Sequence, residues 1–246
     1  MLDLLAAGLP LAATGVFTTR SGGTSLMPWN ALDLAYHVED DPDRVTANRV
    51  LLAAALGLAG GDVVYMEQCH GTGVAVVERP ARPGVEGIPG VDALVTRVRG
   101  VALAVLAADC LPVLLVDPVA GVAAAAHAGR QGLVAGVLQE VLRVMAAEGA
   151  DPARTTAVIG PAVCGRCYEL PQETAQRVAT AVPGSAATTR NGAPSADLTV
   201  GALRLLGAAG VTASAVGGCT VEQPARFYSH RRDGRTGRHA GLVVLR

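Results

Sequence analysis

Lysine is absent from this sequence of 246 residues, in which all 20 residues counted as lysine or arginine are arginine. Schiff-base catalysis, pyridoxal-phosphate attachment and serine–lysine catalysis all need a lysine amine, and so does the phosphate-binding loop of the common nucleotide hydrolases. The sequence therefore excludes these classes of enzyme.

Aromatic residues are also scarce, at 3% of the chain, and neither sign of charge dominates. Proteins that bind single-stranded nucleic acid usually stack bases on aromatic side chains, and proteins that bind duplexes or anionic lipid usually carry a basic excess. With 21 acidic residues against 20 basic ones, the net charge is −1. We therefore expect neither nucleic acid nor a membrane as a partner.

No apolar run is long enough to cross a bilayer, which takes about 20 residues. The most apolar stretch, residues 101–128, is interrupted by Asp109, Pro112, Asp117 and Pro118. The first residues, MLDLLAAGLP, lack the basic start of a signal peptide. Five cysteines, an odd and low number, favour free thiols over disulfides. These features predict a protein of the reducing cytoplasm.

Apolar periodicity and turn residues predict a mixture of strands and helices. A helix is expected at 41–57, where Asp41 can cap and Pro42 takes the first position, and further helices are expected at 131–147, 171–181 and 197–209. Strands are expected in the short apolar runs at 16–20, 63–68, 74–78, 93–96, 101–107, 112–117, 121–126, 155–159, 211–216, 227–230 and 240–245. Residues 81–90 are rich in proline and glycine and are expected to form a loop.

The order of these elements does not alternate regularly between strand and helix, and no G-x-G-x-x-G follows the first strand. A doubly wound nucleotide-binding fold needs both features. We therefore predict an α/β fold in which mixed β-sheets are flanked by helices, not a Rossmann fold.

Three residues with metal-binding chemistry end or follow predicted strands: His70, Cys110 and His127. Two imidazoles and a thiolate form a zinc set, and three protein ligands leave the fourth position open for water or substrate. Each residue also has a structural alternative. His70 can shape a turn before Gly71, Cys110 can be a small buried apolar residue, and His127 can be a hydrogen-bonded core histidine.

Asp109 ends a strongly apolar strand, where a carboxylate without a partner is costly. It is a candidate for orienting a ligand or for acting as a general base, with a salt bridge to arginine as the alternative.

The segment after Tyr228 is dense in donors and can hold a phosphate or carboxylate. Arg20, before Ser21-Gly22-Gly23, is a further anion contact. A solvated hairpin turn is the alternative for the segment, because Asp233-Gly234 is a turn signal. Its candidate residues are His230, Arg231, Arg232, Arg235 and Arg238.

Cys164 and Cys167 form a lone C-x-x-C without a second pair. We interpret them as structural thiols in a loop, with a redox or metal role as the alternative.

An ordered set of motifs spans nearly the whole chain, from about Val16 to Leu245. It reads TTRSGGTS, LDLAYHVEDD, TANR, QCHG, VDALVT, AADCLPVLL, HAG, IGP, CYE, DL, CT and FYSHRRDG. This set resembles the YfiH-type family, also called the multicopper polyphenol oxidoreductase or "laccase domain" family, whose members are regarded as purine nucleoside phosphorylases.

The resemblance implies a single α/β domain over residues 1–246. It also implies phosphorolysis of adenosine, inosine and S-methyl-5′-thioadenosine, with an adenosine deaminase activity. The partners expected are purine nucleosides and inorganic phosphate. The older label, copper-dependent phenol oxidation, fits poorly, because one cysteine and two histidines cannot build a multicopper centre.

The resemblance assigns His70, Cys110 and His127 as ligands of zinc, with copper as the alternative metal. Cys110, Asp109 and His230 are the expected catalytic residues, and Arg20, Arg130, Arg231 and Arg232 are expected to bind substrate or phosphate. The family motif HAGWRG is here HAG-Arg130-Gln131-Gly132, so an arginine replaces a tryptophan. Arg130 can stack on a base by its guanidinium plane or hold phosphate.

Two other hypotheses use the same residues. A metal-free thiol hydrolase or deamidase would use Cys110 as nucleophile and His127 or His70 as base. A non-catalytic zinc-binding module would need a fourth protein ligand such as Cys69. The sequence leaves the oligomeric state open between monomer and homodimer.

Overall fold

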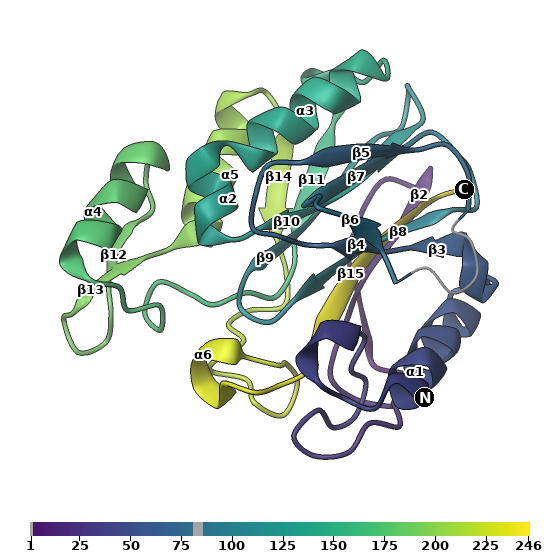
Figure 1. Cartoon of the computed structure of the whole chain (residues 1–246). Helices are drawn as coiled ribbons and strands as arrows, with labels where there is room; N and C mark the ends of the chain where they lie inside the picture. Colours follow the sequence, from purple (N-terminus) through teal and green to yellow (C-terminus); the bar gives the residue numbers. More distant parts are fainter. Residues whose placement is uncertain (1, 81–85) are drawn as a thin grey trace.

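The computed structural model describes residues 2–80 and 86–246, and two large β-sheets form its centre (Figure 1). The five-stranded sheet has the order β1-β2-β15-β8-β3, with strands Leu4–Ala6, Ala13–Thr18, His239–Leu245, Ala102–Ala107 and Val63–Val64. The six-stranded sheet has the order β14-β11-β9-β10-β7-β5, with strands Thr212–Ala215, Thr156–Ile159, Leu111–Asp117, Val122–Ala128, Ala93–Thr96 and Val74–Val77.

Both sheets are mixed, and two small sheets accompany them. Most neighbours pair antiparallel, whereas β3 with β8, β5 with β7 and β11 with β14 pair parallel. The small sheets pair β4 with β6 and β12 with β13; their bounds are Met66–Glu67, Ile88–Pro89, Ala186–Thr188 and Pro194–Ala196. The predicted class, α/β with mixed sheets, is confirmed.

Helices cover the outer faces of the two stacked sheets. In Figure 1, α3 and α5 lie over the six-stranded sheet, and α1 lies on the far side of the five-stranded sheet. The helices are α1 (Pro42–Ala55), α2 (Arg130–Ala135), α3 (Val137–Ala147), α4 (Gln172–Ala181), α5 (Leu198–Ala208) and α6 (His230–Asp233). Short 3-10 helices occupy Tyr36–Val38, Gly60–Asp62 and Pro152–Arg154. No helix in the described part of the chain has the length and apolar character needed to span a membrane.

The two sheets and the helices on their outer faces form four layers. Three apolar clusters fill the spaces between these layers. Phe17, Leu103 and Leu114 belong to the cluster between the sheets. Alternate residues of the same strands face the helices: Leu115 packs with Leu138 on one side, and Ala104 packs with Leu52 on the other. Because β8, β9 and β10 are buried on both faces, they read in the sequence as continuous apolar runs.

The predicted elements match the structure best where both periodicity and capping signals are present. Asp41 caps α1 by accepting from the amide of Asp43, and Pro42 occupies the first position of the helix. The strands expected at 93–96, 101–107, 112–117 and 121–126 correspond to β7, β8, β9 and β10.

Three predictions differ from the structure. The helix expected at 131–147 is two helices, because Gly136 adopts a φ of 94° that ends α2. The strand expected at 63–68 is divided into β3 and β4. The strand expected at 227–230 is wrong: Ser229 accepts from the amide of Arg232 and begins α6. The loop expected at 81–90 lies partly outside the described residues, and its end forms β6.

Candidate metal centre and active-site cavity

Three segments bring His70, Cys110 and His127 together. Cys110 lies in the short link by which the chain crosses from β8 in one sheet to β9 in the other. His127 is on β10, beside β9, and His70 is in the turn after β4. His70 and Asp109 have φ values of 62° and 90°, uncommon for residues other than glycine. The backbone is thus strained where two of the predicted site residues lie.

The donor atoms of the three residues lie within 4.8 Å of one another. Cys110 Sγ is 3.8 Å from His70 Nε2, and the two imidazole rings meet edge to face with centroids 4.7 Å apart. Gly129 lies against the group: a Cβ there would be 3.0 Å from His70 Cδ2 and 3.1 Å from Cys110 Sγ. A glycine at this position therefore gives the three donors their room.

Asp92, a buried carboxylate before β7, organises the group. Its Oδ1 is 2.8 Å from His127 Nδ1 and accepts from the amide of His70 at 2.9 Å. Its Oδ2 accepts from the amide of Gly71 at 2.7 Å and from Cys69 Sγ at 3.1 Å. This arrangement fixes the turn that carries His70 and leaves Nε2 of His127 for a ligand. Asp92 was not among the predicted site residues, although a carboxylate beside an apolar strand was the signal that selected Asp109.

The charges of the group are mutually stabilising. Burial disfavours the Cys110 thiolate, but hydrogen bonds with His127 and His70 outweigh it and bring the pKa of Cys110 to about 6. Burial likewise opposes ionisation of Asp92, yet bonds from His127, Cys69 and Gly71 hold its pKa below the usual range. Against burial, Asp92 and Cys110 raise the pKa of His127 to about 9. The imidazole thus lies between two anionic groups, a place that suits a cation.

These residues fit a zinc ion. Two imidazole nitrogens and a thiolate are ligands that zinc prefers, and the Asp92–His127 pair is the carboxylate–histidine arrangement common at such sites. Within the described residues, the group has no fourth ligand: no further histidine, cysteine or carboxylate joins it. Cys69, the candidate for closing it, instead directs its thiol to Asp92. The group has the three-ligand pattern of a catalytic site rather than the closed pattern of a structural one.

A cavity of about 370 Å³ opens onto this group and is lined with cationic side chains. Arg130, Arg231 and Arg238 line it, together with the imidazoles of His37 and His230. Among the described residues, none of these three guanidinium groups has a carboxylate oxygen within 4.0 Å. Their charge is therefore available to an anionic ligand.

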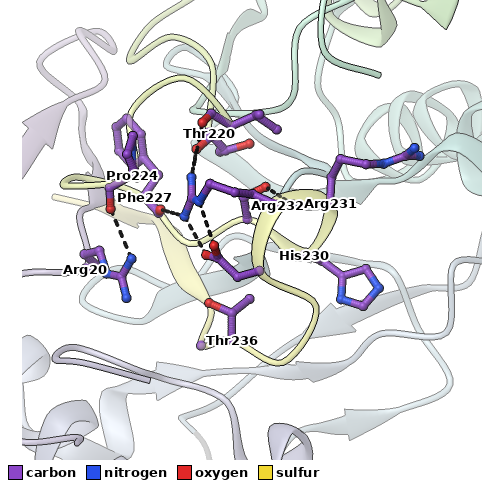
Figure 2. A network of polar contacts seen from close by, with 12 residues as sticks. Arg20, Thr220, Pro224, Phe227, His230, Arg231, Arg232 and Thr236 are labelled. Atoms are coloured by element: carbon purple, nitrogen blue, oxygen red, sulfur yellow. Dashed lines mark hydrogen bonds and ion pairs between the residues drawn. The ribbon is translucent and has the colours of Figure 1, made fainter. Parts of the chain in front are cut away.

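Two adjacent arginines, Arg231 and Arg232, point to different places. In Figure 2, Arg231 and His230 extend to one side of α6, and the guanidinium of Arg232 turns to the other. Arg232 donates to the carbonyls of Thr220 at 2.6 Å and Phe227 at 3.0 Å, and pairs with Asp233 at 2.6 Å. The Arg232 side chain therefore stabilises the loop around α6 and does not line the cavity.

Arg20 also lies outside the residues that line the cavity. It donates to the carbonyls of Asn30 at 2.8 Å and Pro224 at 3.0 Å, the latter visible in Figure 2. Its guanidinium lies over the ring of Tyr228, 4.7 Å from the centroid. The structure thus separates Arg20 and Arg232 from Arg130 and Arg231, which the sequence had grouped as anion contacts.

Asp109 and His230 both line the cavity. Asp109 accepts from Thr220 Oγ1 at 2.5 Å and from the amide of Arg231 at 2.6 Å, so its carboxylate joins β8 to α6. His230 Nδ1 is 2.8 Å from the carbonyl of Gly234, which assigns the Nδ1 proton and leaves Nε2 as the acceptor. The salt bridge to arginine considered for Asp109 is replaced by a backbone amide and a hydroxyl.

The cavity also includes Tyr168 of the CYE motif, which was not a predicted site residue. Its ring lies 5.0 Å from the guanidinium carbon of Arg231. Burial raises the pKa of Tyr168, with nearby Arg130 opposing, so the phenol is neutral. Tyr168 therefore sets an uncharged aromatic ring beside the cationic groups of the cavity.

The fold and the site define an α/β protein in which three candidate metal ligands line a cavity that also carries arginine side chains. Residues 14–246 match the family described as multi-copper polyphenol oxidoreductase laccase, and the chain belongs to that family. It is 52% identical to "Purine nucleoside phosphorylase SCO2081" of Streptomyces coelicolor, over 93% of this chain and 94% of that protein. It is 43% identical to a purine nucleoside phosphorylase of Deinococcus radiodurans, over 98% and 95% of the two chains.

Solved structures agree with this assignment. YlmD from Geobacillus stearothermophilus superposes with a TM-score of 0.92 at 32% identity, over 99% of this chain and 96% of that one. The Neisseria meningitidis protein NMB0706 superposes with a TM-score of 0.86 at 36% identity, over 99% of both chains. The family resemblance identified from the motifs is therefore confirmed.

Proposed function

We propose that the protein is a zinc-dependent purine nucleoside phosphorylase that cleaves adenosine, inosine and S-methyl-5′-thioadenosine, and that also deaminates adenosine. The observation that carries this proposal is the cavity in which the His70–Cys110–His127 group, three arginines and Tyr168 meet. The names of the relatives support the same reaction class.

We assign phosphate binding to Arg130 and Arg231; Arg238 lines the same cavity. Guanidinium groups bind phosphate oxygens through paired hydrogen bonds, and these groups line the cavity without a competing carboxylate among the described residues. Arg130, which replaces the family's tryptophan, lies at the start of α2 directly after Gly129.

In phosphorolysis, a phosphate oxygen bonds to C1′ of the ribose while the bond from C1′ to N9 of the purine breaks. The electron pair of that bond goes to the purine, which takes up a proton. By analogy with glycoside cleavage, the ribose becomes cation-like in the transition state, so a phosphate held below C1′ stabilises it. Arg130 and Arg231 position that phosphate, and Tyr168 stacks against the base.

His230 and Asp109 are the proton carriers in this scheme. His230 Nε2, left as an acceptor by the bond from Nδ1 to the carbonyl of Gly234, can take a proton from water and pass it to the departing purine. Asp109 lines the cavity while its carboxylate oxygens accept from Thr220 and the amide of Arg231, and it moves the proton when water replaces the amino group at C6 of adenosine. His70, Cys110 and His127 would hold the zinc ion, which when bound would supply Lewis-acid chemistry to the cavity.

The experiment compares Cys110→Ala with Cys69→Ser, which keeps a hydrogen-bond donor to Asp92. Phosphate-dependent release of base is measured for the three nucleosides, alongside bound zinc. Cys110→Ala is expected to lose one zinc equivalent and its activity together, and Cys69→Ser to keep both. Full turnover by Cys110→Ala would contradict the proposal.

A second candidate, a metal-free thiol hydrolase or deamidase, has one observation in its favour. The thiol of Cys110 is 3.8 Å from an imidazole nitrogen, and its pKa of about 6 makes it a thiolate at neutral pH. Metal removal distinguishes the two functions. Chelation abolishes the phosphorylase, whereas a thiol hydrolase keeps its activity and loses it to iodoacetamide.

A further inference from the structure

A second group of metal-binding side chains lies outside the active-site group. Cys164 and Cys167 occupy the loop after β11, and Cys219 and Glu222 occupy the turn after β14. The three sulfur atoms and one carboxylate oxygen lie within 4.8 Å of one another. Cys167 Sγ is 3.5 Å and Cys164 Sγ is 3.8 Å from Glu222 Oε1.

The backbone of the two loops brings these side chains together as a set. A turn closed by the amide of Cys167 and the carbonyl of Cys164, 2.9 Å apart, brings the two thiols of the C-x-x-C to one side. The amide of Cys164 also donates to Cys219 Sγ at 3.4 Å, so the backbone of one loop holds the sulfur of the other. Four donors from two loops are the number that a tetrahedral zinc site takes.

We propose that Cys164, Cys167, Cys219 and Glu222 bind a second zinc ion in a closed, four-ligand site. Zinc displaces the thiol protons to solvent and changes the oxidation state of none of the groups. With all four positions supplied by the protein, the site has no place for substrate. Its role is structural, unlike that of the open group at His70.

The surrounding charges fit this metal. Three thiolates and a carboxylate around Zn²⁺ carry a net charge of −2, which needs compensation near the surface. Arg190 donates to Glu222 Oε1 at 2.6 Å, and Arg166 lies 3.4 Å from Oε2. A carboxylate oxygen has two acceptor sites, so Oε1 can accept from Arg190 and still ligate the ion.

The position of the site gives it a consequence for the active site. The two loops that it joins also hold Asp109: the amide of Val163 donates to the Asp109 carbonyl at 3.0 Å, and Thr220 holds the carboxylate. Ala162 and Cys219 pair as a parallel bridge between the same loops. An ion bound by both loops fixes the distance between them. It therefore also fixes the position of Asp109, which both loops contact.

The experiment counts metal in the full chain with two independent knockouts. The apoprotein is titrated with zinc against a chromophoric chelator, and bound zinc is then measured by elemental analysis. We expect two equivalents in wild type and in the control Cys69→Ser, and one in Cys110→Ala. We expect one equivalent in the double variant Cys164→Ser/Cys167→Ser. We expect none when this double variant also carries Cys110→Ala.

Cobalt(II) provides a readout that does not depend on enzyme activity. Loaded into Cys110→Ala, cobalt is expected to give the intense thiolate-to-metal absorption and the visible bands of a tetrahedral site with three thiolates. Glu222→Gln keeps the thiols, so it tests the site even if the double variant does not fold. It is expected to bind the second zinc at least 10-fold more weakly.

One equivalent in wild type, or an unchanged count in Cys164→Ser/Cys167→Ser, would overturn the proposal. A disulfide between any two of the three cysteines in the protein as isolated, detected as a mass two hydrogens lower, would overturn it as well. Because the count of the second ion does not depend on turnover, its failure is separable from failure of the phosphorylase assignment.

Discussion

Asp92 Oδ1 lies 2.8 Å from Nδ1 of His127, and the same carboxylate accepts from three consecutive residues, Cys69, His70 and Gly71. A side chain that does not line the cavity therefore positions two of the three candidate metal ligands at once. It fixes the imidazole of His127 by direct contact and His70 through the backbone of its turn.

Replacing this carboxylate tests that role. Asp92→Asn is expected to weaken zinc binding at the His70 group by about 10–100-fold, the usual effect of losing such an orienting partner. Chelator competition measures the affinity. Asp117→Asn is the matched control, because Asp117 is as buried as Asp92 but lies at the end of β9 far from Cys110. Like Asp92, it accepts from backbone amides, those of Val119, Ala120 and Asp151. Equal loss of zinc affinity in both variants would refute a specific role for Asp92.

Gly129 offers a steric test of the same group. A Cβ at Gly129 would lie 3.0 Å from His70 and 3.1 Å from Cys110, and the backbone there has an ordinary φ of −72°. Gly129→Ala is therefore expected to lower zinc affinity and activity by crowding the ligands, without straining the backbone. Gly207→Ala, on α5 with open space at its Cβ, should raise stability by about 0.5–1 kcal/mol and leave zinc binding unchanged. Unaltered zinc affinity in Gly129→Ala would count against this geometry.

The cationic cavity predicts how phosphate affinity is distributed. Arg130→Ala and Arg231→Ala each remove charged hydrogen bonds worth about 1.5–3 kcal/mol, so the KM for phosphate should rise about 10–100-fold. The KM for the nucleoside should change less. Arg143→Ala is the control, since Arg143 pairs with Glu140 on the exposed face of α3. A KM for phosphate that is unchanged in both cavity variants would exclude them as phosphate ligands.

Asp33 predicts a pH dependence of stability that is independent of the metal. Burial raises the pKa of Asp33 to about 7, despite hydrogen bonds from the amides of Arg238 and Ala35, with Asp40 and Arg238 as the charged neighbours. The folded protein therefore binds this proton more tightly than the unfolded chain. Its contribution is complete below about pH 4 and is lost as the pH rises to 7, a change on the order of 4 kcal/mol.

Asp33→Asn should remove this loss, so that urea unfolding at pH 5 and pH 8 gives more similar free energies than in wild type. The exposed Asp43 provides the comparison, because Asp43→Asn should keep the wild-type difference. If the difference between the two pH values is the same in Asp33→Asn as in wild type, another group causes it.

The central strands could be predicted from the sequence because they follow from local signals, and the candidate metal ligands were selected by their places relative to those strands. Continuous apolar runs marked β8, β9 and β10, and His70, Cys110 and His127 stood at or near the ends of such strands. That the three side chains meet was implied by the family resemblance, and the structure brings their donors within 4.8 Å. The crossing from one sheet to the other at Cys110 is a tertiary feature with no local signature.

Other features depended on contacts that a sequence does not encode locally. Arg231 and Arg232 are neighbours of identical chemistry, yet only Arg231 lines the cavity, because the carbonyls of Thr220 and Phe227 bind the other. Asp92 acts across 35 residues on His127. A single glycine, Gly136, was enough to divide a predicted helix into α2 and α3.

The most direct test of the whole account is the phosphate dependence of nucleoside cleavage by zinc-quantified wild-type protein. Inosine is incubated with and without phosphate, and hypoxanthine and ribose 1-phosphate are measured together. The account predicts equal amounts of the two products with phosphate and neither without it. Base released at the same rate without phosphate, or no base released by protein whose His70 group is loaded with zinc, would contradict it.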